Sequence, residues 1–322
     1  MDISVILCTY NRCERLPRAL ESLAASELPD PIEWEVIIVD NNSKDRTREV
    51  AQEACNASAG RFKYIFEPTP GKSNALNTGI REAKGRVLAF MDDDVVAERL
   101  WLYNLTCGLL GGGWMGSGGR ILPEWGCQSP DWIPQNFRAL GPLAVFDLGD
   151  KAGPLGEAPF GTNMAFHRSM FEKYGTFRTD LGPNPFNQIR SEDSEFALRL
   201  LDAGEKLRYE PEAVVYHYVS PERLRKSYFL KWWYDKGRAD MRQYGVPSTR
   251  WSVAGVPVVM LRRLVAWTVR WLFRVSPLQR FDAKLKVWGN AGMILETYRL
   301  RKQCPILVDA PALRTVGAAR QK

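Results

Sequence analysis

In the N-terminal third of the chain, short apolar runs alternate with segments whose apolar residues recur at helical spacing. The apolar runs are rich in Val, Ile and Phe, which is typical of buried strands. The intervening segments carry an apolar residue every three or four positions, as amphipathic helices do. Strands are expected at 3–10, 35–40, 62–68 and 86–92, and helices at 16–26, 43–54 and 72–83.

This alternation predicts an α/β fold in which a mainly parallel sheet is flanked by helices. Ser43 is the expected N-cap of the second helix. The Gly- and Pro-rich stretches 111–126 and 141–163 are expected to be loops that surround a site. A helix at 191–204 and a strand at 213–220 complete this part of the chain.

Polar residues follow three of the predicted strands. They occur in the stretches "CTYNR" (8–12), "VDNNS" (39–43) and "MDDDV" (91–95). An isolated Asp after a strand is usually a turn former. In a parallel sheet, however, the loops at the carboxyl ends of the strands form the crevice that binds ligands. The three stretches together therefore predict a binding site at that edge.

The three consecutive carboxylates of Asp92, Asp93 and Asp94 repel one another unless a cation lies among them. Clustered hard oxygen ligands suit Mg²⁺ or Mn²⁺, although a solvated loop is the simpler alternative. Side chains alternate in an extended segment, so Asp92 and Asp94 are expected on one side and Asp93, in a structural role, on the other. The pattern is therefore interpreted as a D-x-D motif.

Composition and charge limit the remaining choices. The 322 residues, 45% of them hydrophobic, allow one large or two smaller domains. The net charge of +7 favours an anionic partner, which is a nucleotide phosphate, a nucleic acid or an anionic membrane face. The six cysteines contain no C-x-x-C pair and are expected to be reduced thiols. The first residues do not resemble a secretory signal, which predicts a cytoplasmic protein.

From about residue 221 the chain becomes helical, aromatic and basic. The segment 251–281 contains five arginines and no acidic residue. On a helical wheel, Arg263, Arg270 and Arg274 fall within about 40° of one another, and apolar residues cover much of the remainder. The arginines argue against a spanning helix. A helix lying in an anionic membrane interface is expected, on the inner face of the membrane, with the core helix of a small helical domain as the alternative.

The chain also resembles a known enzyme family. Five stretches, in this order, are similar to motifs of the family 2 glycosyltransferases, which have the GT-A fold and use nucleotide-sugar donors: "VILCTYNR", "VIIVDNNSKD", "GKSNALNTGI", "GRVLAFMDDDV" and "SEDSEFALRL". The resemblance covers roughly residues 3–220. It implies a glycosyltransferase domain at 1–220, followed by a basic, aromatic helical extension at 221–322 that is expected to associate with a membrane.

The resemblance implies roles for individual residues around the donor. In this view Asp40 bonds the base, Lys72 lies near the phosphates or the base, and Asp92 contacts the ribose or the metal. Asp94 is the direct ligand of the Mn²⁺ or Mg²⁺ ion, and His217 completes the metal or diphosphate site. The remaining residues expected to line the nucleotide-sugar pocket are Thr9, Tyr10, Arg12, Asn42, Asn74, Asp93, Gly161 and Asn163.

For catalysis, the family's acidic motif matches Glu192 and Asp193, and Asp193 is the implied base. Attack by the acceptor hydroxyl on the face opposite the leaving diphosphate then inverts the anomeric configuration. Acids at a helix start are common, so this pair alone is weak evidence. The expected donor is a UDP-sugar, and the expected acceptor is lipid-linked or a glycan in cell-surface polysaccharide or glycolipid synthesis.

One departure from the family pattern and two alternative functions accompany this interpretation. The Q-x-x-R-W motif of processive synthases is replaced at 229–241 by "FLKWWYDKGRADM", which favours the addition of one or a few sugars. A sugar nucleotidyltransferase is disfavoured because "CTYNRCERLP" lacks the Gly-rich loop of that class. A catalytically silent, membrane-associated nucleotide-binding adaptor is disfavoured by the complete set of acids. A nucleic-acid partner is not expected, since much of the basic excess lies in an apolar, aromatic segment.

Overall fold

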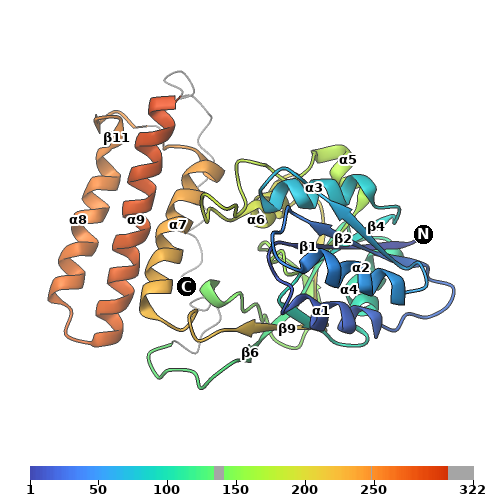
Figure 1. Cartoon of the computed structure of the whole chain (residues 1–322). Helices are drawn as coiled ribbons and strands as arrows, with labels where there is room; N and C mark the ends of the chain where they lie inside the picture. The colour runs from blue at the N-terminus through green and yellow to red at the C-terminus, as the bar shows by residue number, and fades with distance from the viewer. Residues whose placement is uncertain (134–140, 248, 304–322) are drawn as a thin grey trace. The chain divides into compact units, whose positions relative to one another are not determined.

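The computed structural model describes residues 1–133, 141–247 and 249–303 (Figure 1). The chain divides into two compact units. The first consists of Met1–Asn187 and Glu192–Leu224, and the second of Gln188–Ser191 and the chain from Arg225 onward. Each unit has its own architecture.

The first unit is built on one mixed sheet, which has nine strands within the described residues. Eight of them follow the order β3-β2-β1-β4-β8-β6-β9-β5, and β7 pairs with β9. Strands β1 to β4 are parallel, while β8 pairs antiparallel with β4 and with β6. The strands are β1 (Ile3–Thr9), β2 (Trp34–Asp40), β3 (Phe62–Phe66), β4 (Val87–Asp92), β5 (Val95–Ala97), β6 (Gly116–Trp125), β7 (Gly153–Pro154), β8 (Asn163–His167) and β9 (Leu207–Val219).

Helices cover both faces of this sheet, so its central strands are buried on both sides. Figure 1 shows α1, α2 and α4 on one side and α3, α5 and α6 on the other. Rings from β4, β8, α5 and α6 pack together in the core, with Phe171 stacked on Phe196 at 4.4 Å. The helices are α1 (Leu16–Ala24), α2 (Thr47–Ala57), α3 (Lys72–Glu82), α4 (Trp101–Leu110), α5 (Arg168–Tyr174) and α6 (Glu192–Asp202).

The predicted α/β alternation is confirmed, and the register of the strands places the polar stretches side by side. Thr9 at the end of β1 lies opposite Asp40 at the end of β2. On the other side of β1, Cys8 lies opposite Asp92 at the end of β4. The three carboxyl ends therefore open onto one edge of the sheet.

Two local predictions are wrong. The second helix begins at Thr47, not after Ser43, because the segment between them folds into a loop bonded to the end of β1. Most of the stretch 111–126 is strand β6 and not a loop. Its glycines allow close packing inside the sheet: a Cβ on Gly119 would lie 2.2 Å from the carbonyl oxygen of Ala213.

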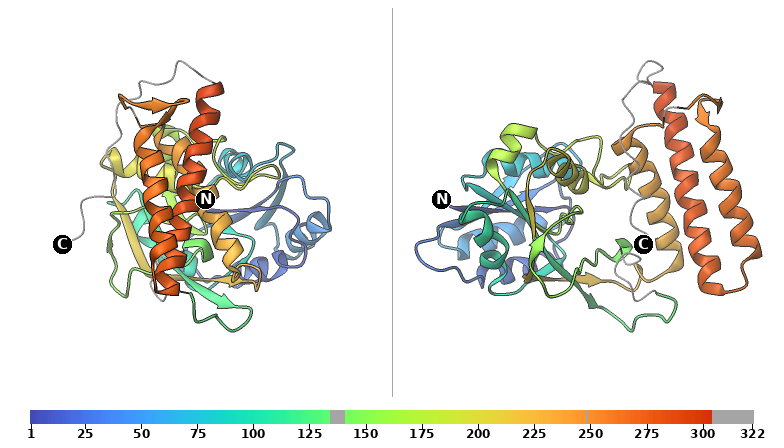
Figure 2. Two further views of the ribbon diagram at one scale, coloured as in Figure 1. Left: turned by 90° about the vertical axis from the view of Figure 1, so that its left-hand side faces the viewer. Right: turned by 180° about the vertical axis from the view of Figure 1, so that it is seen from behind.

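The described part of the second unit contains three long helices and a short hairpin. Helix α9 (Pro277–Gln303) packs between α7 (Lys226–Tyr244) and α8 (Val258–Phe273), and Figure 2 shows the three from two further sides. The hairpin pairs β10 (Ser252–Val253) with β11 (Val256–Pro257). Across the described residues, no helix combines the length and apolar content needed to cross a bilayer.

Glycine and a buried ion pair join α7 to α9. A Cβ on Gly237 would lie 2.0 Å from the carbonyl oxygen of Gly289, so the two helices approach too closely for a larger residue there. Glu296 of α9 is 1% exposed and accepts hydrogen bonds from Arg238 (3.0 Å) and Arg242 (2.6 Å) of α7. These contacts fix the two helices to each other.

Candidate active site

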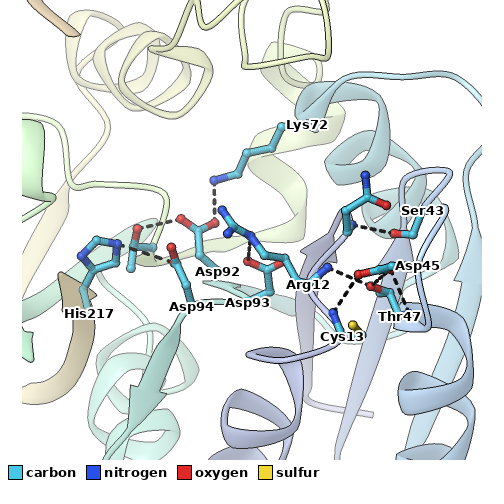
Figure 3. Close-up of polar contacts among 12 residues, drawn as sticks. Arg12, Cys13, Ser43, Asp45, Thr47, Lys72, Asp92, Asp93, Asp94 and His217 are labelled. Carbon is cyan, nitrogen blue, oxygen red and sulfur yellow. Dashed lines mark hydrogen bonds and ion pairs between the residues drawn. The ribbon is translucent and has the colours of Figure 1, made fainter. Parts of the chain in front are cut away.

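The loops that follow β1 and β2 are bound to each other at the edge of the sheet (Figure 3). The backbone N–H of Asn11 donates to the hydroxyl of Ser43 at 2.9 Å, and that of Arg12 donates to the hydroxyl of Thr47 at 2.8 Å. The N–H of Cys13 donates to the carboxylate of Asp45 at 3.2 Å. These bonds give the first wall of the site a fixed backbone.

Asp40 is the last residue of β2 and lies beneath the loop that follows it. Its side chain is buried, and its two carboxylate oxygens accept hydrogen bonds from the N–H of Ser43 (2.9 Å) and the hydroxyl of Tyr64 (2.9 Å). Burial, together with the Asp40 carboxylate, raises the pKa of the Tyr64 hydroxyl, which therefore stays a donor. Asp40 thus holds the loop, and its contact with a nucleotide base stays a prediction.

The three carboxylates of the "MDDDV" stretch have three different sets of partners. The Asp92 carboxylate accepts from Lys72 at 2.5 Å and from the Thr162 hydroxyl at 2.8 Å. Asp93 lies 3.8 Å from the Arg12 guanidinium. Strand β4 ends at Asp92 and the chain turns, so the expected alternation of side chains breaks down. Asp93 therefore faces Arg12, a residue predicted to line the nucleotide pocket, and its partner differs from those of Asp92.

The third carboxylate, Asp94, lies between an imidazole and a guanidinium. Its oxygens are 3.6 Å from Nε2 of His217 and 3.0 Å from Arg223. A second guanidinium nitrogen of Arg223 donates to His217 Nε2 at 2.7 Å, which makes that nitrogen the acceptor of the imidazole. Burial opposes the charge of Asp94, but its interactions with His217 and with the two arginines nearby outweigh it and lower its pKa. Asp94 is therefore ionised.

Burial has the opposite result at Asp93. Its carboxyl group is buried next to the ionised Asp94, and the pKa of Asp93 is raised to about 7. The Arg12 guanidinium offsets only part of this effect. Asp93 therefore gains a proton near neutral pH.

Lys72 connects the aspartate stretch to the predicted catalytic acids. It begins helix α3, where its backbone N–H donates to the carbonyl of Pro183 at 3.0 Å. Its ammonium group lies 2.5 Å from Asp92 and 4.0 Å from Glu192. Burial opposes this charge, but the two carboxylates outweigh it and raise the pKa of Lys72. Lys72 is therefore a fixed cation at the centre of the site.

Glu192 and Asp193 begin helix α6. Glu192 is buried, and burial followed by the charge of Asp193 raises its pKa to about 7. Asp193 is half-buried and accepts a hydrogen bond from the N–H of Gly161 at 2.6 Å. Gly161 therefore lies against the predicted base, where a Cβ would be 3.0 Å from its carboxylate.

The other residues predicted to line the pocket differ in exposure and in their hydrogen-bond partners. Tyr10 is exposed, while Asn42 and Asn74 use their amides to bind the carbonyls of Pro68 and Pro70. Thr9 is buried at the end of β1. Asn163 does not line the pocket, which corrects that prediction: it is 0% exposed within the sheet and bonds the carbonyls of Arg120 and Ala213 and the indole of Trp101.

Thr162 and Arg223 belong to the site and were not predicted. Thr162 is adjacent in sequence to the predicted Gly161, and nothing but its hydroxyl distinguishes it there. Arg223 follows His217 in the stretch "HYVSPERLRKS", where three basic residues come soon after the histidine. That basic run was the available signal for Arg223.

The predicted metal ligands are only partly assembled. Within the described residues, no group of three or more His, Cys, Asp or Glu side chains is placed to hold a metal ion. Asp92 is bound by Lys72, so the predicted trio with Asp94 and His217 does not form a metal site. Asp94 and His217 do face each other, and one carboxylate with one imidazole suits a cation whose other ligands are phosphate oxygens or water.

A mixed sheet with helices on both faces, and with acids and a lysine gathered beyond the carboxyl ends of its parallel strands, places the chain in the class of α/β proteins with a GT-A-type fold. Residues 4–175 match the model of the family described as "Glycosyl transferase family 2". The chain therefore belongs to this family, as its motifs predicted.

Relatives and solved structures agree with this assignment. The chain is 26% identical to glucosyl-dolichyl phosphate glucuronosyltransferase of Haloferax volcanii, over 67% of this chain and 69% of that one. It is 26% identical to the succinoglycan biosynthesis protein ExoM of Rhizobium meliloti, over 72% and 71% of the two chains.

Among solved structures, the mannosyltransferase PcManGT of Pyrobaculum calidifontis, in complex with GDP-Man and Mn²⁺, superposes with a TM-score of 0.59 at 17% identity, over 94% of this chain and 87% of that one. Residues 1–349 of S. aureus TarS in complex with UDP-GlcNAc give a TM-score of 0.52 at 17% identity, over 93% and 92%. At these identities the structures establish the fold alone.

Proposed function

We propose that this glycosyltransferase is an inverting enzyme that moves a sugar from a nucleotide diphosphate-sugar to a hydroxyl group of a lipid-linked or glycan acceptor. The observation that carries the proposal is the position of Lys72, whose ammonium group lies 2.5 Å from Asp92 of the donor motif and 4.0 Å from Glu192 of the acidic motif. One cation thus joins two motifs that lie far apart in sequence. Its charge suits a diphosphate bound beside it.

Asp94 and His217 would hold the divalent cation, with the diphosphate oxygens as its other ligands. When bound, Mn²⁺ or Mg²⁺ neutralises the charge that develops on the leaving diphosphate. Arg223 contacts both proposed ligands and supplies positive charge at the same place. Arg12 and Lys72 add two further cations around the diphosphate position. The site therefore concentrates positive charge where the leaving group becomes more negative.

Asp193 is the proposed base. It takes the proton of the acceptor hydroxyl as the hydroxyl oxygen bonds to the anomeric carbon, while the bond from that carbon to the diphosphate breaks. The N–H of Gly161 orients the Asp193 carboxylate. Because the hydroxyl attacks opposite the leaving group, the anomeric configuration inverts. Glu192 precedes Asp193 and lies 4.0 Å from the ammonium group of Lys72, whose positive charge it helps to stabilise.

The proposal also includes the nucleotide of the donor and the type of acceptor. A UDP-sugar is the expected donor, although the two structural neighbours contain a GDP-sugar and a UDP-sugar respectively. A lipid-linked or polysaccharide acceptor agrees with the names of the relatives. The two bonded loops that follow β1 and β2, with the exposed Tyr10 in the first of them, are the proposed binding site of the base.

The test is release of nucleotide diphosphate from a panel of UDP- and GDP-sugars with Mn²⁺ and with lipid-linked or oligosaccharide acceptors. One donor is expected to turn over, with the product anomer opposite to that of the donor. Retention of configuration would contradict the inverting mechanism. If donors bind but no acceptor or water releases diphosphate, the chain is the silent adaptor. Release of pyrophosphate from a nucleoside triphosphate and a sugar phosphate would instead identify a nucleotidyltransferase.

A further inference from the structure

Helix α8 presents an apolar face that no described residue covers. Its side chains reach exposures unusual for large apolar residues: Val265 is 63% exposed, Val269 49%, Leu272 58% and Phe273 79%. Val275 in the turn after the helix and Leu278 at the start of α9 are exposed as well. Contiguous exposed apolar surface of this kind marks a site of interaction.

The same helix is packed on its other side. Met260 is 3% exposed, and with Leu261 it contacts Met293 and Ile294 of α9. The interior of the second unit therefore accounts for one side of α8, and among the residues of this unit that the structure describes the other side has no partner. An amphipathic helix normally turns its polar side to water. Here the exposed side carries the apolar residues.

Arginines border this face. At 100° per residue, Leu272, Val265, Val269 and Phe273 span an arc of about 100°. Continuing around the helix in the same direction, Arg270, Arg263 and Arg274 span about 40°. No acidic residue occurs between Trp251 and Phe281. An apolar strip beside a purely basic strip has the pattern of a helix that lies in an anionic lipid interface.

The hairpin before α8 extends the same surface. Trp251 is 71% exposed and Val253 59% exposed. A surface hollow between the hairpin and the helix is lined by Thr249, Trp251, Val258, Val259 and Arg262. Tryptophan prefers the boundary between lipid tails and water, and an arginine in such a hollow suits a phosphate group.

We propose that this face, defined by Trp251, Val265, Val269, Leu272 and Phe273 with Arg263, Arg270 and Arg274 at its border, docks on an anionic membrane surface. Charge complementarity selects the membrane over a protein partner, since the border is basic throughout and has no acid to pair with mixed charge on a protein. The helix lies on the bilayer and does not cross it. Binding needs neither donor nor acceptor, so the proposal goes beyond the transferase reaction and stands or falls separately from it.

The test is co-sedimentation of the full chain with vesicles of pure phosphatidylcholine and with vesicles that also contain phosphatidylglycerol. Binding is expected only to the anionic vesicles. Replacing Arg263, Arg270 and Arg274 with Gln should weaken it on the order of a hundredfold. The double variant Leu272→Ser/Phe273→Ser should weaken binding to the anionic vesicles at low salt, although it leaves every arginine in place.

Matched controls keep the result specific. The first control removes three positive charges from the first unit, by changing the exposed Arg18, Arg86 and Arg99 to Gln. Leu100→Ser/Leu148→Ser removes two exposed apolar side chains from the same unit. Far-UV circular dichroism should show unchanged helix content in every variant, because all these positions are on the surface. The controls should bind as the unaltered chain does.

Three outcomes would overturn the proposal. The first is equal binding to neutral and anionic vesicles. The second is unchanged binding of the α8 variants. The third is failure to bind any vesicle, with the chain forming an oligomer that Leu272→Ser/Phe273→Ser dissociates, which would assign the face to a second copy of the protein. As an independent readout, lipids brominated near the head group should quench tryptophan emission, and Trp251→Phe should reduce that quenching.

Discussion

The guanidinium of Arg223 lies 3.0 Å from the carboxylate of Asp94, across 129 positions of sequence, and it also donates to His217. It thus contacts both side chains proposed to hold the divalent cation. Without a cation, the positive charge of Arg223 compensates the buried carboxylate. A cation that binds Asp94 therefore meets Arg223 as an electrostatic competitor.

Replacing Arg223 with Met should raise the affinity for Mn²⁺ in the absence of nucleotide by about tenfold or more, because a charge a few ångströms from the ion is removed. Electron paramagnetic resonance of free Mn²⁺ during a titration measures this directly. Asp94→Asn should abolish the binding, and Arg99→Met, at an exposed ion pair, should leave it unchanged. Weaker Mn²⁺ binding by Arg223→Met would mean that the arginine organises the site and does not compete for it.

Asp193→Asn should lower kcat by about a hundred- to ten-thousandfold, because Asn cannot take the proton of the acceptor hydroxyl. The affinity for the nucleotide diphosphate, measured by calorimetry, should stay within about twofold, since Asp193 lies on the acceptor side of the proposed reaction. Asp202→Asn, at the other end of α6, is the matched control and should keep full activity. An active Asp193→Asn enzyme would remove this residue from the role of base.

The raised pKa of Glu192 predicts a pH-dependent stability. The folded protein holds this proton more tightly than the unfolded chain, whose glutamate has an ordinary pKa near 4.5. The contribution of this bound proton to the stability of the folded protein is therefore complete below about pH 4.5 and is lost as the pH rises through about 7.

Glu192→Gln has no proton to lose. Its stability relative to the unaltered protein should therefore rise between pH 5 and 8, by about 3 kcal/mol. Urea unfolding across this range measures the difference, and Asp93, which titrates in the same window, cancels because it is present in both proteins. Glu53→Gln, at an exposed position of α2, should show no such change. A pH-independent difference for Glu192→Gln would show that the carboxyl group is ionised throughout.

The buried pair between α7 and α9 predicts a stability effect in the second unit. Glu296→Gln removes the buried charge that both Arg238 and Arg242 bond and should cost about 3 kcal/mol, because two half-buried arginines each lose an ion pair with it. Thermal unfolding followed by circular dichroism measures the loss. Asp282→Asn, exposed on the same helix, should change little. Equal melting temperatures for both variants would show that glycine packing, and not this ion pair, holds the helices together.

Local sequence patterns determined the secondary structure of the first unit and the edge at which the site lies. Alternation of apolar runs with helical spacing gave β1, β2 and β4, and the polar residues after them had to meet because carboxyl ends of parallel strands share an edge. The hydrogen bond between Lys72 and Asp92 lies at this edge of the sheet, where the sequence predicted the site. The apolar and basic positions of α8 were visible too, because helical geometry projects them onto separate arcs.

Contacts between distant segments were decided only by the tertiary structure. The turn after Asp92 directs Asp93 toward Arg12. Asn163 is held inside the sheet by hydrogen bonds. The Gly-rich segment of β6 forms a strand because its neighbours in the sheet leave no room there for larger side chains. Arg223 meets Asp94 because β9 returns the chain to the site edge beside β5. The packing of α8 on α9 decided which of its apolar residues are buried. A local pattern records which residues share a face, whereas the partner of that face depends on how separate elements pack.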